Sequence, residues 1–284
     1  MTDNAAPELQ PPFRPMMRII ETLTMKNARY AQLIYILFFF SLALNSHSKQ
    51  PTGMPYLLYW AWEAPHDMTG LDPLKAGIAE LTASIYIKGN QLIYHRRQQP
   101  LHAPEAIYRI AVIHIEARPR WQPLLDKPTA EKIALAIKKI YSRKKYNALQ
   151  IDFEVSPAQR TFYRHVLLAL RQLLGRKQVI SITALASWCT SDRWIGPAKL
   201  PVDMVVPMYF SLNRDRLAKQ AFIHHFPHAI TRLAPECQSA IGLATFEPWQ
   251  MPLRAKVPVF VFTRGSWNIH TLEQAEQLAF AVQH

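Results

Sequence analysis

Leu149-Gln150-Ile151-Asp152-Phe153-Glu154 is a short run in which apolar and polar residues alternate. Successive side chains of a β-strand point to opposite faces, so one face of this strand is apolar and the other carries Gln150, Asp152 and Glu154. Two carboxylates on one face of an otherwise apolar strand are costly to desolvate. The pattern therefore predicts a strand that ends in a functional site.

Seven further apolar runs after residue 50 have the character of strands, and helical patterns separate several of them. The eight expected strands cover residues 56–62, 83–88, 108–116, 148–154, 179–186, 204–210, 240–245 and 257–263. Helical spacing and capping residues predict helices over residues 129–143, 156–174 and 271–282, which begin at Thr129, Ser156 and Thr271. The segments after the fifth and seventh strands are short, so helices there are expected to be reduced or missing.

Eight strands with intervening helices in about 230 residues predict an α/β protein, a single TIM-like (β/α)8 barrel over residues 50–284. The alternative is an open doubly wound sheet. That fold is disfavoured because the chain has only eight glycines and no G-x-G-x-x-G motif after a strand. The polar residues 95–100 are expected to form a loop after the second strand.

Composition and charge restrict the function. Hydrophobic residues make up 49% of the chain, which excludes a disordered protein, and the net charge is +13. Such a charge indicates an anionic partner, either a polymer, lipid headgroups or nucleic acid, or else only a basic surface. No zinc-finger, RNP or helix-turn-helix signature accompanies it, so no nucleic acid is expected as a partner.

The N-terminal region resembles an export signal. Lys26 and Arg29 precede the apolar residues 33–44, and small residues follow at Ser46 and Ser48. Residues 25–48 therefore predict a signal peptide and a periplasmic or secreted protein. An uncleaved anchor in the inner membrane, associated through residues 30–44, is the alternative. Residues 1–24 are expected to be disordered or to precede the true start at Met17 or Met25.

The two cysteines, Cys189 and Cys237, form no disulfide framework. A pair in an oxidising compartment and a free, half-buried Cys189 are both compatible with the sequence. A nucleophilic cysteine is disfavoured because no histidine or asparagine can be assigned to it.

In a (β/α)8 barrel the chemistry lies at the carboxyl ends of the strands. The residues expected there are Trp62, Glu63, Lys88, His114, Glu116, Arg118, Asp152, Glu154, Trp188, Tyr209, Glu247, Arg264 and Trp267. Carboxylates can do acid–base chemistry and aromatic rings can stack on sugar faces, so this set indicates a carbohydrate site.

Several of these residues have an alternative interpretation. Trp60, Trp62 and Trp188 fit core packing as well as a sugar platform, and His114 fits an ordinary interior histidine. His224 and His228 have a metal-ligand spacing, but Pro227 interrupts it and no carboxylate accompanies them, so a surface cluster is preferred. We expect neither a metal ion nor a cofactor.

The catalytic hypothesis concerns Asp152 and Glu154. Two like charges in a partly dry pocket raise the pKa of one group, which would keep Glu154 protonated as a proton donor, with Asp152 as its partner. The alternative is a structural pair of carboxylates bound to Arg118 or Arg264.

The same motif resembles a known family. Gln150-x-Asp152-x-Glu154 is similar to the fourth-strand D-x-D-x-E element of chitinase-like glycoside hydrolases, in which the glutamate is the general acid. Here Gln150 stands at the first aspartate. A longer series resembles the domain of unknown function 3142 family, a bacterial family with a glycoside-hydrolase-like barrel: Leu149–Glu154, Thr161–Tyr163, Leu170–Arg171, Ser181–Leu185, Ser187–Cys189 and Val206–Phe210.

The resemblance implies a barrel, and a carbohydrate or anionic polysaccharide as partner. A chitinase-type mechanism uses the acetamido group of the substrate as nucleophile, with Glu154 as acid and Asp152 orienting the acetamide. A two-carboxylate mechanism would instead need Glu63, Glu116 or Glu247. Met208 and Tyr209 are adjacent, where those enzymes have Met-x-Tyr. The expected substrate-binding residues are Gln150, Trp62, Glu116, Trp188, Tyr209 and Arg264. The competing hypothesis is a non-catalytic barrel that binds an anionic glycan or an envelope partner.

Overall fold

The computed structural model describes residues 53–190, 192, 194–211, 233–247 and 256–283. The chain divides into two units, residues 1–47 and 48–284, and all described residues belong to the second. The predicted signal segment and the extension before it lie outside the described residues. Within the described part, no helix is both long and apolar enough to cross a membrane.

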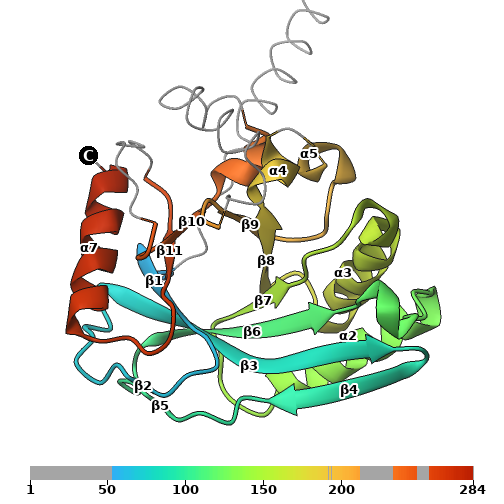
Figure 1. Ribbon diagram of the computed structural model, residues 1–284, viewed down its shortest axis with the longest axis horizontal. Helices are drawn as coiled ribbons and strands as arrows, with labels where there is room; N and C mark the ends of the chain where they lie inside the picture. The colour runs from blue at the N-terminus through green and yellow to red at the C-terminus, as the bar shows by residue number, and fades with distance from the viewer. Residues whose placement is uncertain (1–52, 191, 193, 212–232, 248–255, 284) are drawn as a thin grey trace, which may run out of the picture. The chain divides into compact units, whose positions relative to one another are not determined.

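Eight parallel strands close into a barrel, as Figure 1 shows. Their order around the barrel is β1, β3, β6, β7, β8, β9, β10, β11, and β1 pairs with both β3 and β11. The strands are β1 (Leu57–Ala61), β3 (Ala76–Lys88), β6 (Tyr108–Glu116), β7 (Ala148–Asp152), β8 (Val179–Leu185), β9 (Met204–Met208), β10 (Ile241–Ala244) and β11 (Val259–Phe262). The predicted (β/α)8 fold is confirmed.

The segments between the strands differ in size. Three helices of 15 residues each are described, α2 (Lys127–Tyr141), α3 (Arg160–Leu174) and α7 (Ile269–Gln283). Among the described residues between β8 and β9, the helices are the four-residue α4 (Ala186–Cys189) and α5 (Ile195–Ala198), which confirms the expected reduction. The remaining short elements are η1 (Pro119–Trp121), η2 (Pro157–Gln159), η5 (Pro235–Gln238), β2 (His66–Asp67), β4 (Gln91–Arg96) and β5 (Leu101–His102).

Two separate apolar cores follow from the alternation along the strands. One fills the barrel, with Leu58, Trp60, Ile110, Val112 and Phe260 among its buried members. The other lies between the barrel wall and the helices, and it includes the outward-facing residues of the same strands. Because both faces of each strand are buried, the strands appear in the sequence as nearly continuous apolar runs.

The second barrel strand is longer than its predicted range. It begins at Ala76 rather than Ala83. The prediction missed the run from Ala76 to Thr82 because this run contains glycine and glutamate, which are uncommon in strands. Beyond the barrel, β3 continues into a hairpin with β4, in which Lys88 lies opposite Gln91. His95 and Arg96 therefore belong to a strand, and their assignment to a loop was wrong. The Gly89-Asn90 turn between two apolar runs was the available signal.

Helix capping agrees in part with the sequence. Asp126 rather than Thr129 caps α2, and its side chain accepts a hydrogen bond from the Thr129 backbone amide at 2.8 Å. Ser156 does begin the next helical segment, and its backbone N–H donates to the Gln159 side chain at 2.9 Å. Before α7, Asn268 and Thr271 each bind the backbone N–H of the other, so the helix begins earlier than predicted.

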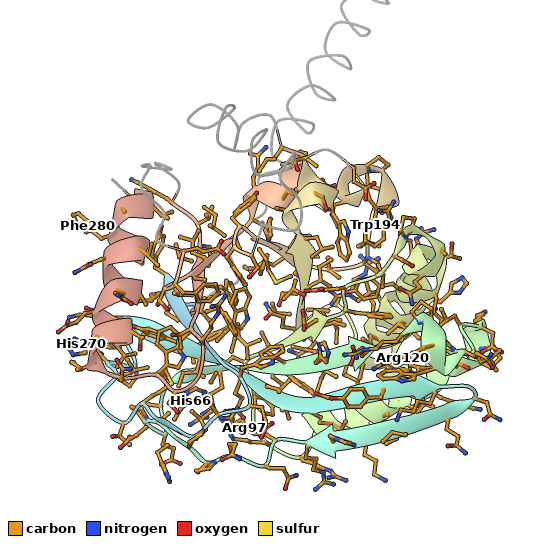
Figure 2. All side chains as sticks on the ribbon, viewed as in Figure 1. His66, Arg97, Arg120, Trp194, His270 and Phe280 are labelled. Atoms are coloured by element: carbon orange, nitrogen blue, oxygen red, sulfur yellow. A yellow bond between two sulfur atoms is a disulfide. The ribbon has the colours of Figure 1, made fainter. Side chains whose placement is uncertain are left out.

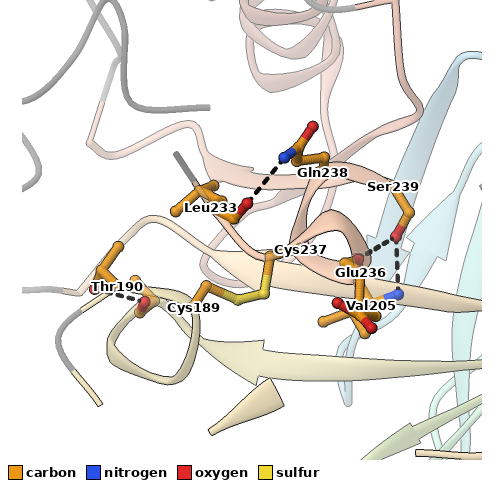
Figure 3. The surroundings of a disulfide bond; sticks show 9 residues. Cys189, Thr190, Val205, Leu233, Glu236, Cys237, Gln238 and Ser239 are labelled. Carbon is orange, nitrogen blue, oxygen red and sulfur yellow. Dashed lines mark hydrogen bonds between the residues drawn. A yellow bond between two sulfur atoms is a disulfide. The ribbon is translucent and has the colours of Figure 1, made fainter. Parts of the chain in front are cut away.

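Cys189 and Cys237 form a disulfide, with their Cα atoms 5.9 Å apart (Figure 3). It joins α4 to η5 and therefore links the segment after β8 to the segment before β10. Both cysteines are buried, at 3% and 2% exposure. Of the two alternatives that the sequence left open, the structure has the pair.

Candidate active site

Three polar side chains on neighbouring strands form a hydrogen-bonded row near the carboxyl end of the barrel. His114 of β6 lies opposite Asp152 of β7. Its Nδ1 is 2.7 Å from one carboxylate oxygen of Asp152, and the hydroxyl of Thr183 on β8 donates to the other oxygen at 2.6 Å. Asp152 is only 6% exposed. Both of its oxygens are therefore held by groups of the barrel wall.

The pKa of His114 is raised by the negative charges around it. Burial alone would lower that pKa, because a desolvated imidazolium is unfavourable. The hydrogen bond and charge of Asp152, with the charges of Glu116 and Glu154, outweigh burial and raise the pKa of His114 above its usual value. The fold thus favours an imidazolium–carboxylate ion pair at this position.

Gln150 lies two residues before Asp152 on the same face of β7 and is fully buried. The indole N–H of Trp60 donates to its side-chain oxygen at 2.6 Å, and its amide donates to the Ser181 hydroxyl at 3.3 Å. These partners satisfy a neutral amide. Position 150 therefore holds no second charge beneath Asp152, and the structure places Gln150 inside the barrel rather than at its rim.

Glu154 lies two residues beyond the last residue of β7 and is exposed, while Phe153 and Val155 on either side are buried. The predicted alternation therefore extends past the strand end. The charge of Glu154 contributes to raising the pKa of His114, after the larger effects of Asp152 and Glu116. A side chain that is both exposed and near His114 can reach a bound molecule.

Glu116 is the third carboxylate near His114, two residues further along β6. It is half-buried and forms an ion pair with Arg118. Arg118 therefore binds Glu116, whereas both oxygens of Asp152 are bound to His114 and Thr183.

Aromatic side chains line the part of the barrel end next to His114. The Trp62 ring contacts His114 edge-on, with ring centres 5.9 Å apart, and also contacts Phe262 at 6.3 Å. Phe262 stacks on Phe210 with ring centres 5.6 Å apart. The exposed guanidinium of Arg264 lies 4.0 Å from the ring centre of Phe246. Half-buried rings thus lie beside the row of His114, Asp152 and Thr183, an arrangement suited to a sugar.

The loop after β1, which carries Trp62, is fixed by Arg97. Its guanidinium donates to the carbonyl oxygens of Ala61 at 3.0 Å, Trp62 at 2.5 Å and Ala64 at 2.5 Å. Glu63 supports the same contact, since its carboxylate accepts hydrogen bonds from the backbone amides of the residues that follow Arg97. Glu63 therefore has a structural partner near the rim.

His66 fixes the loop from the other side. Its Nδ1 accepts a hydrogen bond from the Trp267 backbone N–H at 3.1 Å, and its Nε2 lies 3.2 Å from the Trp62 carbonyl oxygen. Burial, with the charge of Arg97, lowers the pKa of His66. Trp267 also donates from its indole to the Trp60 carbonyl at 2.9 Å. His66 is thus a neutral bridge, whereas the surroundings of His114 favour its charged form.

Two predicted substrate-binding residues lie elsewhere. Trp188 is 2% exposed, belongs to the core outside the barrel and packs edge-on against Trp194, with ring centres 4.8 Å apart. Tyr209 is 3% exposed and belongs to the same outer core, and burial raises the pKa of its hydroxyl. The structure therefore does not bring these two residues to the carboxylates.

The other predicted residues are distributed around the barrel end. Glu247 accepts a hydrogen bond from the backbone N–H of Ser211 at 2.9 Å, and Lys88 lies over the Trp121 ring. His224 and His228 lie outside the described residues. Among the residues that are described, no group of three metal-ligating side chains occurs.

Sequence reasoning missed Thr183, Arg97 and His66. Thr183 could have been found, because Ser181 and Thr183 are polar positions with strand spacing in the run next to that of Asp152. Arg97 and His66 gave no local signal, since their partners are carbonyl and amide groups set by the tertiary fold.

No protein-family model matches the chain, and no curated protein matches it in sequence. Among solved structures, the chain is similar to a GH18 chitinase from Pseudoalteromonas aurantia, with a TM-score of 0.53 and 10% identity over 79% of this chain and 99% of that one. A second similar structure is the ICChI chitinase from Ipomoea carnea, with a TM-score of 0.46 and 8% identity over 80% of this chain and 98% of that one. At these identities the likeness concerns the fold.

Proposed function

We propose that this chain is a glycoside hydrolase that cleaves a glycan, with Glu154 as the general acid and Asp152 as the group that orients the substrate. The observation that carries the proposal is the placement of Glu154. It is an exposed carboxyl group two residues after the end of β7, and β7 carries the central residue of the His114–Asp152–Thr183 row. The carboxyl ends of the strands are where barrels of this kind carry their chemistry.

Glu154 would donate a proton to the glycosidic oxygen as the bond to the leaving sugar breaks. Trp62 offers a ring on which the sugar can stack.

Asp152 has capacity left for a ligand. A carboxylate can accept about four hydrogen bonds, and His114 and Thr183 use one site on each oxygen. A free site could accept an N–H from an acetamido group and hold that group against the anomeric carbon. The resemblance to chitinase-like enzymes supports this role, and the fold shared with the GH18 chitinase from Pseudoalteromonas aurantia is consistent with an amino-sugar substrate.

The proposal is tested by screening envelope glycans and N-acetylglucosamine oligomers with the wild-type protein and Glu154→Gln. We expect a loss of turnover of about two to four orders of magnitude for Glu154→Gln, because glutamine keeps the shape but has no proton to give. Thermal unfolding should be unchanged, since Glu154 is exposed. The control is Glu131→Gln, which neutralises an exposed carboxylate on α2. Turnover that survives in Glu154→Gln would overturn the assignment.

A specific observation favours a second candidate, a non-catalytic barrel that binds an anionic glycan. Gln150 stands where the D-x-D-x-E element has its first aspartate, and Trp60 and Ser181 satisfy its amide, so one carboxylate of that element is missing here. In this case Glu154→Gln leaves binding unchanged, while neutralising arginines at the barrel end weakens it at low salt.

We further propose that the protein is exported and acts in the bacterial envelope. The N-terminal pattern of residues 25–48 supports this location, and so does the Cys189–Cys237 disulfide, because disulfides persist mainly in oxidising compartments. Fractionation of cells producing the full chain tests it, with an uncleaved chain in the inner-membrane fraction indicating an anchor instead. From the motifs described in the sequence analysis, we also propose that the chain is a member of the domain of unknown function 3142 family.

A further inference from the structure

A compact group of basic and aromatic side chains adjoins the carboxyl end of β6. Trp121 of η1 has three cations around its ring, and we name Lys88, Arg118, Arg120 and Trp121 the Trp121 patch. The Lys88 ammonium lies 5.2 Å from the ring centre, and the guanidinium carbons of Arg118 and Arg120 lie at 5.2 and 5.7 Å. Figure 2 labels Arg120 near the ends of β3 and β6.

The backbone fixes this patch to the β3–β4 hairpin. The amide of Gly89 in the hairpin turn donates to the Trp121 carbonyl at 2.9 Å, and the amide of Leu124 donates back to the Gly89 carbonyl at 2.7 Å. The Trp121 ring also packs edge-on against Tyr86, with ring centres 5.8 Å apart. The indole is therefore held in place before any ligand binds, which lowers the entropic cost of binding.

The charge of the patch is unbalanced. Arg118 has a carboxylate partner in Glu116, but within the described part of the chain neither Lys88 nor Arg120 forms an ion pair. Three cations against one carboxylate leave a local charge of about +2. Like charges gathered at one ring repel each other, and an exposed cation–π contact compensates for this only weakly. An anion bound among them would relieve the repulsion.

The patch is continuous with the candidate active site. Glu116, the carboxylate that binds Arg118, is two residues from His114 on β6 and adds to the negative field around it. Arg118 in turn contacts Trp121. A chain-like ligand whose reacting bond lies at Glu154 would therefore extend over the patch with a neighbouring unit.

We propose that the Trp121 patch binds a uronic acid unit of the glycan, as a subsite next to the proposed active site. This proposal rests on the proposed function for the path of the glycan from Glu154 to the patch. The patch itself is tested by binding alone. A uronic acid carries a ring and a carboxylate in one unit. The ring can stack on the indole, while the exposed Lys88 and Arg120 side chains move to the carboxylate. A phosphodiester places its charge between rings and fits this arrangement less well.

The test measures binding to the full chain carrying Glu154→Gln, so that the ligand is not cleaved. The probes are oligogalacturonate and its fully methyl-esterified form, which share the same ring but differ in charge. We expect the acid to bind at least about tenfold more tightly than the ester at low salt, and the difference to shrink as salt screens the charges.

In the same background, Lys88→Gln with Arg120→Gln should weaken oligogalacturonate binding by about tenfold and flatten its salt dependence, because each exposed ion pair is worth a few-fold. The matched control is Arg176→Gln with Lys177→Gln. It removes the same charge from exposed residues in the loop before β8, at the amino end of the barrel, and should leave binding unchanged. Trp121→Leu should weaken the acid and the ester alike.

Equal binding of acid and ester would overturn the proposal, as would an equal loss in the control variant, which would show an effect of net charge only. Tighter binding of phosphorylated dextran than of oligogalacturonate would also overturn it, in favour of a phosphate site. Failure of the proposed function is a separate result, because Glu154→Gln would then retain turnover while the binding comparison is unaffected.

Discussion

Two buried carboxylates in neighbouring parts of the barrel wall have opposite surroundings. Glu80 of β3 is 4% exposed and binds Arg109 at 2.6 Å, Lys144 at 2.8 Å and the Tyr146 hydroxyl at 2.8 Å. Asp152 has only one titratable partner, His114, and a neutral hydroxyl. Glu80 is thus balanced by cations that keep their charge throughout the physiological pH range, and Asp152 by one whose charge changes within it.

The comparison teaches that a carboxylate in a strand is not by itself a functional site. Burial alone would raise the pKa of Glu80, but hydrogen bonds from Lys144 and Tyr146 and the charges of Lys144 and Arg109 lower it below its usual value. Glu80 accepts three hydrogen bonds and faces the loop between α2 and β7, away from the barrel interior. Asp152 faces the interior beside an exposed acid, Glu154, and keeps unused acceptor sites.

The largest expected effect is a loss of stability when the Glu80 network is broken. Glu80→Ala leaves the Arg109 guanidinium, whose side chain is 12% exposed, without its partner, and should lower the free energy of unfolding by about 3–5 kcal/mol. Lys144 is half exposed and can turn to water, so its contribution is smaller. Urea unfolding of the purified variant measures the change.

The matched control is Lys75→Ala, which removes one partner of an exposed ion pair with Asp72 and should cost less than about 1 kcal/mol. A Glu80→Ala variant as stable as this control would show that the buried network contributes little. Glu80 and Asp152 could then no longer be distinguished by a stabilising role of Glu80.

The next effect concerns pH. A histidine whose pKa is raised by folding stabilises the protein fully below its unfolded pKa, near 6.5, and this contribution is lost as pH rises through the higher folded value. The stability difference between the wild type and Asp152→Asn should therefore be greatest below about pH 6.5, at about 1–2 kcal/mol, and should shrink as the pH rises. Urea unfolding between about pH 5.5 and pH 8.5 measures it.

Glu80 provides the internal comparison for this series. A carboxylate with a lowered pKa contributes stability above its unfolded value, near 4.5, and that contribution is lost only as pH falls through the folded value. The cost of Glu80→Ala should therefore be constant over the same pH range. A constant cost for Asp152→Asn as well would contradict the proposed His114–Asp152 ion pair.

The barrel could be predicted from the sequence because its strands are buried on both faces, as Ile110, Val112 and Ile113 show in β6. The beginning of β3 could not, since Gly77 and Glu80 suit a strand only through tertiary contacts. The position of Asp152 followed from strand alternation. Its partner His114 did not, because strand register sets a contact across 38 residues. Propensity and spacing report local structure, whereas hydrogen-bond partners across strands depend on the closed barrel.

The smallest expected effect compares the two histidines. His66 accepts from the Trp267 amide and binds the Trp62 carbonyl, so only the neutral ring makes both contacts. Because its pKa is lowered by folding, its contribution is present above pH 6.5 and is lost as pH falls, the reverse of His114. Glutamine has one acceptor and one donor and no titration in this range, so His66→Gln should approach or exceed wild-type stability near pH 5, with differences of about 1 kcal/mol. A difference between His66→Gln and the wild type that is independent of pH would contradict a neutral His66 bound to Trp62. His66 and His114 would then not respond oppositely to acid.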